Sequence, residues 1–198
     1  MFVVGPYLFT GEELDKYLVA RKAAALAAAR EEASGADSEA DGADLVAAIY
    51  DRFHIPQTQM HPDDAYFIEE HPLDDEQCAA IGVSDEDKPK YKSIGIVVPY
   101  TGDEHLLTRQ PTIYSAHQPQ AEVKDGALHM EWYLNEVEEY QLENNFKRQI
   151  ALIDRTLEVT QWQAMGCNQE MMEALKQEIL GTGPGNGNAA AERAGNTE

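Results

Sequence analysis

Positively charged residues are scarce in this sequence. The 198 residues include 15 Lys and Arg against 36 Asp and Glu, which gives a formal net charge of -21. Direct binding of nucleic acid or of an anionic membrane is not expected, because both depend on cationic contacts. Two functional uses of this negative charge remain: faster association with a basic protein partner, and imitation of nucleic acid. The simpler alternatives are solubility and adaptation to a saline cytoplasm.

Cysteines and long apolar runs are also few. The two cysteines, Cys78 and Cys167, lie far apart and show no metal-binding spacing, which is typical of a reducing compartment. No stretch approaches the roughly 20 apolar residues of a membrane span. The first six residues have no basic flank and too short an apolar run for a signal peptide. We therefore expect a soluble, cytoplasmic protein.

Complete catalytic motifs are missing as well. The sequence has no nucleophile elbow, no Walker loop and no dinucleotide fingerprint, and the glycines of residues 181–187 follow no strand. No catalytic residue and no cofactor are therefore predicted, and a non-enzymatic role is favoured.

The patterns that are present predict an α+β fold. Thr10 and Glu13 form a capping-box pattern ahead of a helix that reaches about Glu32. Residues 34–42 read as an acidic linker, and a second helix runs from about Ala43 to before Pro56. The predicted division is an N-terminal helix and linker (1–42), an α+β domain (43–180) and a disordered tail (181–198).

A small antiparallel sheet is expected in the middle of the chain. Asp125 and Gly126 form a two-residue turn, which places Val123 opposite Leu128 and Glu122 opposite His129. Residues 94–100 are nearly all apolar, which favours a central neighbouring strand.

A long helical hairpin is expected after the sheet. The pattern predicts a helix from about Glu136 to Gln163, an end at Gly166, and a return helix over residues 169–180. The first helix carries an apolar stripe, which we expect to pack on the sheet or on a second copy. This predicted interface comprises Leu142, Phe146, Ile150, Ile153 and Leu157.

Two histidine-proline pairs precede paired aspartates, in residues 61–64 and 71–75. Proline and carboxylates suit the first turn of a helix, so both segments are expected to start helices. The alternative is a Zn or Mn site, because imidazole and carboxylate groups can hold either metal. Its candidate ligands are His61, Asp63, Asp64 and His71, with Asp74 and Asp75 nearby.

A ligand pocket is expected around the strand ends and turns that follow residue 99, where binding groups often lie. Arg109 is one of few cations and would hold an anionic ligand; alternatively, it pairs with a carboxylate such as Asp103. The candidate ligand-binding residues are Tyr100, Thr101, Asp103, Arg109, Tyr114 and His117.

Three short segments carry a resemblance to a known group of proteins. Residues 97–103 read Val-Val-Pro-Tyr-Thr-Gly-Asp, residues 110–112 Gln-Pro-Thr, and residues 120–123 Gln-Ala-Glu-Val. They resemble uncharacterised bacterial proteins with a VPFTGD…PST…PPRAEV pattern and a long following helix, although Tyr100 and Ile113 depart from it. The resemblance spans about residues 49–180. It implies a scaffold or sensor region associated with defence systems or mobile elements.

The function we expect is a non-enzymatic interaction or sensor module that binds a protein partner or forms a homodimer through the helical hairpin. Two alternatives stay open. One is a metal-dependent hydrolase that uses the region from His61 to Asp75. The other is an acidic mimic of nucleic acid that inhibits a DNA-binding protein.

Overall fold

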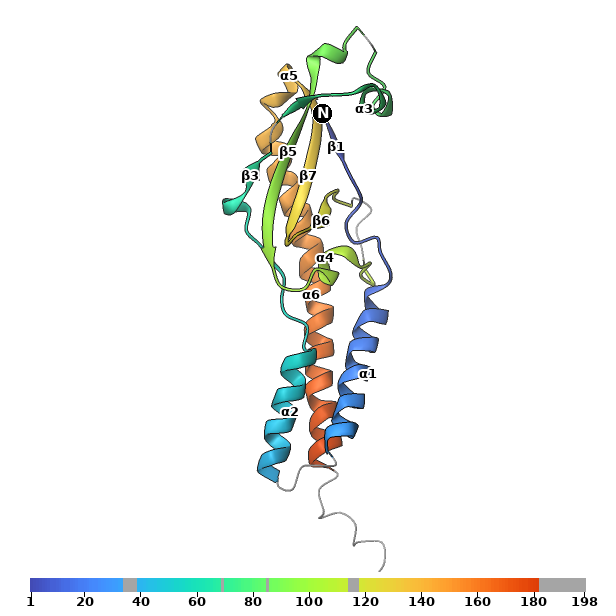
Figure 1. The fold of residues 1–198 in the computed structure, drawn as a ribbon, viewed down its shortest axis with the longest axis vertical. Coiled ribbons are helices and arrows are strands. Elements are labelled where there is room, and N and C mark those ends of the chain that lie inside the picture. Colours follow the sequence, from blue (N-terminus) through green and yellow to red (C-terminus); the bar gives the residue numbers. More distant parts are fainter. Residues whose placement is uncertain (34–38, 69, 85, 114–117, 182–198) are drawn as a thin grey trace, which may run out of the picture. The chain divides into compact units, whose positions relative to one another are not determined.

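The computed structural model describes residues 1–33, 39–68, 70–84, 86–113 and 118–181 (Figure 1). The fold is α+β, as predicted. The chain divides into two compact units, one formed by Met1–Leu14 with Pro56–Trp162 and the other, within the described residues, by Asp15–Ile55 with residues 163–181. The expected boundaries at residues 42 and 180 stay a prediction, and residues 182–198 of the expected tail lie outside the described residues. Within the described ranges, no helix is both long and apolar enough to cross a bilayer.

The first unit contains an antiparallel sheet built around two long strands, β5 (Tyr91–Thr101) and β7 (Ala127–Asn135). β7 pairs on its other side with β1 (Phe2–Val4) and β6 (Glu122–Lys124). β5 pairs with three short strands, β2 (Gln59–Met60), β3 (Tyr66–Phe67) and β4 (His71–Pro72). The central position predicted for residues 94–100 is therefore confirmed.

The hairpin between β6 and β7 has the predicted register. Val123 pairs with Leu128 and Glu122 with His129. Asp125 and Gly126 have φ values of 52° and 75°, so both turn residues adopt the left-handed conformation that a tight hairpin turn requires.

One face of the sheet forms the core of the first unit. Ile94 pairs with Trp132 and Ile96 with Met130, and because side chains alternate along a strand all four lie on the same face. The first part of helix α6 (Leu142–Leu180) packs on this face, where the rings of Trp132 and Phe146 lie 6.4 Å apart. Burying each large apolar side chain contributes about 1.5–3 kcal/mol.

Short helices complete the first unit. The turns η2 (Pro62–Asp64) and η3 (Lys88–Lys90) are 3-10 helices, and α4 (His105–Thr108) and α5 (Glu136–Glu139) have one α-helical turn each. α3 (Asp75–Ala80) begins with a capping box between Asp74 and Gln77. The helix start predicted after His61 is present only as the single 3-10 turn η2. A helix also starts in the segment 71–75, with Asp74 as its N-cap, but His71 and Pro72 belong to a strand that pairs with β5 and not to the first helical turn.

The second unit is a packing of three helices: α1 (Leu14–Glu32), α2 (Glu39–Phe53) and the last part of α6. Ala25 and Ala29 are fully buried, and such small side chains let helices approach closely. Asn168 accepts a hydrogen bond from the backbone N–H of Ile55 and donates one to its carbonyl. Ion pairs join α1 to α6, among them Lys22 with Glu170.

The capping box predicted at Thr10 does not form. The Thr10 hydroxyl donates to the Tyr7 carbonyl at 2.8 Å, and α1 begins only at Leu14. The backbone N–H of Gly11 donates to the Thr108 carbonyl and that of Leu14 to the Gln110 carbonyl. This pairing of backbone groups holds residues 11–13 outside the helix.

The predicted helical hairpin is also wrong. α6 runs without a break from Leu142 to Leu180 and includes Gly166, and α5 is a separate turn that ends before it. The residues after Gly166 are helix-compatible, and Met171 and Leu175, four apart, are fully buried. Continuing the buried stripe outweighs the roughly 1 kcal/mol that an interior glycine costs a helix.

Replacing Gly166 by alanine is expected to raise the free energy of unfolding by about 1 kcal/mol. An added Cβ at this position meets no atom within 4 Å, so only the helix propensity changes. Denaturant unfolding measures the effect. Gly126→Ala is the matched control, since its φ of 75° makes alanine unfavourable by about 1–2 kcal/mol. A loss of stability in Gly166→Ala would contradict the continuous helix.

Candidate functional site

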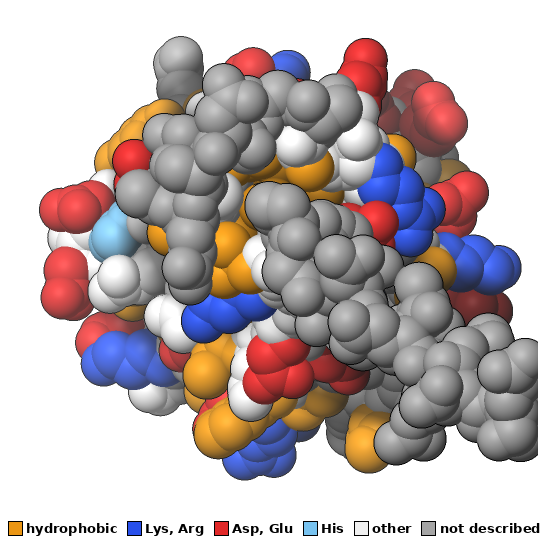
Figure 2. All heavy atoms as spheres, turned by 90° about the horizontal axis from the view of Figure 1, so that it is seen from below, with side chains coloured by type: hydrophobic (Ala, Val, Ile, Leu, Met, Phe, Trp, Pro, Cys, Tyr) orange, Lys and Arg blue, Asp and Glu red, His pale blue; other side chains and the backbone are white. Residues whose placement is uncertain are grey.

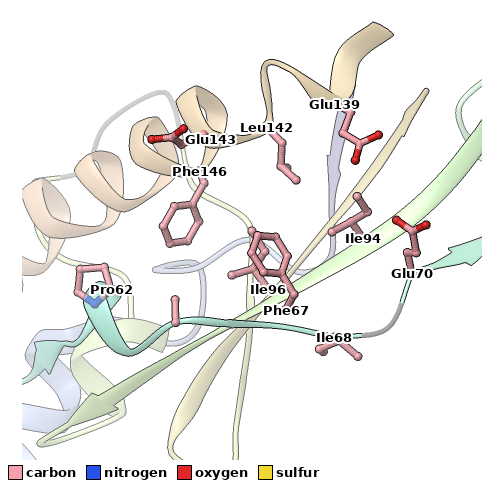
Figure 3. Close-up of a pocket in the computed structure, with 11 residues that line it drawn as sticks. Pro62, Phe67, Ile68, Glu70, Ile94, Ile96, Glu139, Leu142, Glu143 and Phe146 are labelled. Carbon is pink, nitrogen blue, oxygen red and sulfur yellow. The ribbon is translucent and has the colours of Figure 1, made fainter. Parts of the chain in front are cut away.

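An apolar groove of about 660 Å³ lies in the first unit (Figure 3). It lies between the segment that contains β3 on one side and the α5–α6 region on the other, above β5. We call it the groove. Its lining residues are Pro62, Ala65, Phe67, Ile68, Glu70, Ile94, Ile96, Glu139, Leu142, Glu143 and Phe146.

The strand and helix periodicities explain the apolar lining. Ile94 and Ile96 are alternate residues of β5 and lie on one face. Leu142 and Phe146 are four apart on α6 and share a helix face. Phe67 pairs with Ile96 in the sheet, so its side chain is on the same face as the two isoleucines (Figure 3). Five large apolar side chains from three parts of the chain thus line one hollow.

The β3 segment exposes three consecutive large apolar side chains. The exposed fractions are 56% for Tyr66, 69% for Phe67 and 45% for Ile68. Gly95 helps to position the last of them, because a Cβ at this glycine would lie 3.1 Å from the Ile68 side chain. Tyr66 pairs with Val97 and so lies on the sheet face opposite Phe67, whereas Phe67 and Ile68 line the groove. Exposed apolar side chains beside an apolar hollow are typical of a binding surface.

Carboxylates surround the apolar lining. Lys92 Nζ lies 2.9 Å from Glu70 Oε2 and 3.0 Å from Glu139 Oε2 and so joins two sides of the groove. These two hydrogen bonds raise the pKa of Lys92, which keeps the amine charged. Glu143 pairs with Lys147 one turn further along α6, and this contact lowers the pKa of the Glu143 carboxyl.

Of the residues predicted to bind a ligand, Tyr100 and Thr101 end β5, and Asp103 and Arg109 flank α4 and make contacts within the chain. Asp103 accepts a hydrogen bond at 2.9 Å from the backbone N–H of His105, at the start of α4. Arg109 Nη1 pairs with Glu12 Oε2 at 3.1 Å. Burial, with a smaller effect of Glu104, raises the pKa of Tyr100. Two of the predicted residues, Tyr114 and His117, lie outside the described residues.

The residues predicted to hold a metal are not brought together. His61 Nε2 lies 3.2 Å from Thr101 Oγ1, Asp63 and Asp64 belong to η2, and His71 pairs with Ser93 across two strands. Asp74 caps α3, and Asp75 pairs with Lys88. In the described segments no group of three His, Cys, Asp or Glu side chains could hold a metal ion.

The apolar stripe predicted as an interface belongs to the core. Ile153 is fully buried, Leu142, Ile150 and Leu157 are buried, and Phe146 is half-buried against Trp132. The stripe lies on one face of α6, as predicted. Packing within the same chain covers Ile150, Ile153 and Leu157, whereas Leu142 and Phe146 also line the groove.

A smaller hollow, of about 270 Å³, lies on the opposite face of the sheet. Its polar lining includes His71, His129 and Glu122, and the buried Ser93 hydroxyl donates to Glu131. Sequence reasoning anticipated only the pairing of His129 with Glu122. It missed the groove, although the apolar triplet of residues 66–68 between acidic neighbours was a visible signal.

Comparison with family models, curated proteins and solved structures gives no significant match. The resemblance to uncharacterised bacterial proteins therefore stays a prediction, together with the link to defence systems or mobile elements that it implies.

Proposed function

We propose that this protein is a non-enzymatic interaction module, acting as a scaffold or sensor, that binds a protein partner through the groove. The observation that carries the proposal is the pair of exposed side chains, Phe67 and Ile68, that line an apolar hollow. Their burial by a partner would remove apolar surface from water, the main driving force of protein association. Of the α6 stripe that the sequence suggested as an interface, only Leu142 and Phe146 would take part in this binding, together with the β3 segment.

The hollow is also suited to hold a protein segment rather than a flat surface. Phe67 lies on the wall formed by the β3 segment and Phe146 on the wall formed by α6, and Ile94 and Ile96 of β5 complete the lining (Figure 3). Hot spots of protein interfaces are typically large side chains that fill such recesses, and the surrounding contacts exclude water. A groove of this kind favours one or two anchoring side chains over a broad contact area.

The two alternative functions have less support. An acidic mimic of nucleic acid needs ordered rows of carboxylates, but on the face drawn in Figure 2 acidic side chains are interspersed with Lys and Arg. The ion pairs Arg30–Glu178 and Arg52–Glu32 illustrate this mixing in the second unit. A metal-dependent hydrolase would need the ligand cluster that is not found among the described residues of the 61–75 region.

The proposal predicts that Phe67→Ser weakens partner binding at least tenfold. Phe67 is 69% exposed, so the change in stability should stay within about 0.5 kcal/mol. Val19→Ser is the matched control, because Val19 is 68% exposed but lies in the second unit. The partner is first recovered from the native cell with a photo-crosslinking amino acid at position 67, and calorimetry with the purified partner then compares the variants.

Two results would contradict the proposal. One is a crosslinking pattern from position 67 that is the same as that from position 19. The other is a partner that binds Phe67→Ser as tightly as the original protein.

A further inference from the structure

We propose that the occupant of the groove is a segment of another protein in which large apolar side chains are flanked by lysine or arginine. This inference rests on the proposed function and adds the chemistry of the partner. It is carried by the combination of an apolar lining with carboxylates at its edge.

The carboxylates at the edge of the groove are accessible to an incoming cation. The side chains of Glu70, Glu139 and Glu143 are 59%, 49% and 77% exposed, respectively. A carboxylate can accept several hydrogen bonds, so each retains acceptor capacity beside its present lysine partner. Charge-assisted bonds from a guanidinium or ammonium group fit these acceptors, whereas an acidic segment would be repelled.

A second copy of the chain does not satisfy this requirement. Its most exposed apolar run, residues 66–68, is flanked by Asp63 and Asp64 on one side and Glu69 and Glu70 on the other. Inserting this run into the groove of another copy would bring acidic residues against acidic residues, in a protein with a net charge of -21.

The C-terminal residues of the same chain do not satisfy it either. Residues 182–198 include no large apolar side chain, and they hold two glutamates against one arginine. They could neither fill the apolar groove nor supply the positive charge that would pair with the carboxylates at its edge. The occupant that fits both features is a basic and apolar segment of a different protein.

Lys92 gives the inference a sharp test. This lysine occupies Glu70 and Glu139 in the free protein, so a cation from the partner must share these carboxylates with it or displace it. Lys92→Gln should therefore tighten binding of a basic peptide by about two- to fivefold, the range that exposed ion pairs are worth. A groove that prefers acidic segments would show the opposite change.

The experiment uses the full chain and three short fluorescent peptides, measured by anisotropy at low and at high salt. The first peptide carries leucine and phenylalanine between lysines, the second has glutamate in place of each lysine, and the third keeps the lysines but has serine at the apolar positions. The first is expected to bind at least tenfold more tightly than either of the others. Salt should weaken its binding, as should Glu139→Gln, while Val19→Ser should leave it unchanged.

Each other outcome overturns the inference in a distinct way. Equal binding of the lysine and glutamate peptides would remove the charge preference but leave the groove as a partner site, since crosslinking at position 67 tests that separately. Equal binding of the serine peptide would mean unspecific attraction to an acidic protein. Weaker binding to Lys92→Gln, or dimers in native mass spectrometry that Phe67→Ser abolishes, would exclude a basic partner segment.

Discussion

Replacing Trp132 by alanine should lower the free energy of unfolding by about 3–5 kcal/mol. Trp132 is fully buried in the middle of β7, where it pairs with Ile94 on one side and Val3 on the other. Its ring also contacts Phe146 of α6. Removing the indole leaves a cavity between sheet and helix, and close-packed neighbours collapse only partly into such a space.

The measurement is denaturant unfolding followed by far-UV circular dichroism, which does not depend on tryptophan fluorescence. Trp162→Ala is the matched control: Trp162 is 65% exposed, so its loss should change stability by no more than about 0.5 kcal/mol. Trp132→Phe should lose less than half as much as the alanine variant, because phenylalanine keeps most of the buried ring and the indole N–H has no hydrogen-bond partner among the described residues. Equal effects at positions 132 and 162 would contradict the core described above.

The sheet could be predicted because its rules are local. A two-residue turn fixes the register of its own hairpin, so Asp125 and Gly126 were enough to pair Glu122 with His129. The central position of β5 followed from a run of apolar residues too long for a strand with one exposed face. Each of these inferences needed only neighbours within about a dozen residues.

The errors arose where distant contacts override local preference. Gly166 is a plausible helix end in isolation, but the buried residues after it hold the helix together. Thr10 has the sequence of an N-cap, but backbone bonds to Thr108 and Gln110 fix the chain around it. A local sequence pattern cannot predict either effect. The partners of residues 11–14 are almost a hundred residues away, and the residues after Gly166 are buried by packing against other helices.

The groove escaped prediction for a similar reason. Its walls come from residues 62–70, 94–96 and 139–146, and no spacing rule relates these segments. The α6 stripe was recognised as apolar, but periodicity identifies a face and not what covers that face. Only the fold shows that the sheet buries the stripe while residues 66–68 stay exposed.

Gly102→Ala is expected to lower the free energy of unfolding by at least about 3 kcal/mol, since it combines backbone strain with a steric clash. Gly102 has a φ of 100°, which side chains other than glycine's rarely allow. A Cβ there would lie 2.1 Å from the Gln57 carbonyl oxygen and 2.6 Å from Thr58 Cα. Both are backbone atoms, so no flexible side chain can move away to relieve the contact.

Gly5→Ala separates the two causes. Gly5 also has a positive φ, of 119°, but its added Cβ would meet nothing within 4 Å. It should therefore show only the backbone strain, about 1–2 kcal/mol, and the difference between the two variants measures the clash. Equal losses of unfolding free energy in Gly5→Ala and Gly102→Ala would mean that the backbone around Gln57 shifts to accommodate the Cβ with no energetic penalty.

The expected clash also bears on residues 101–103, which the sequence suggested as part of a ligand pocket. Thr58 is buried, its hydroxyl donates to the Asp103 carbonyl at 2.7 Å, and its own carbonyl accepts from Gln161 at 2.5 Å. Gly102 lets the turn approach this buried residue closely. A large destabilisation would support a structural origin for the Thr-Gly-Asp motif: it joins the end of β5 to the preceding loop and to α6. A binding partner would then be sought at the groove. The groove lies on the opposite face of the sheet from the smaller hollow lined by His71 and His129.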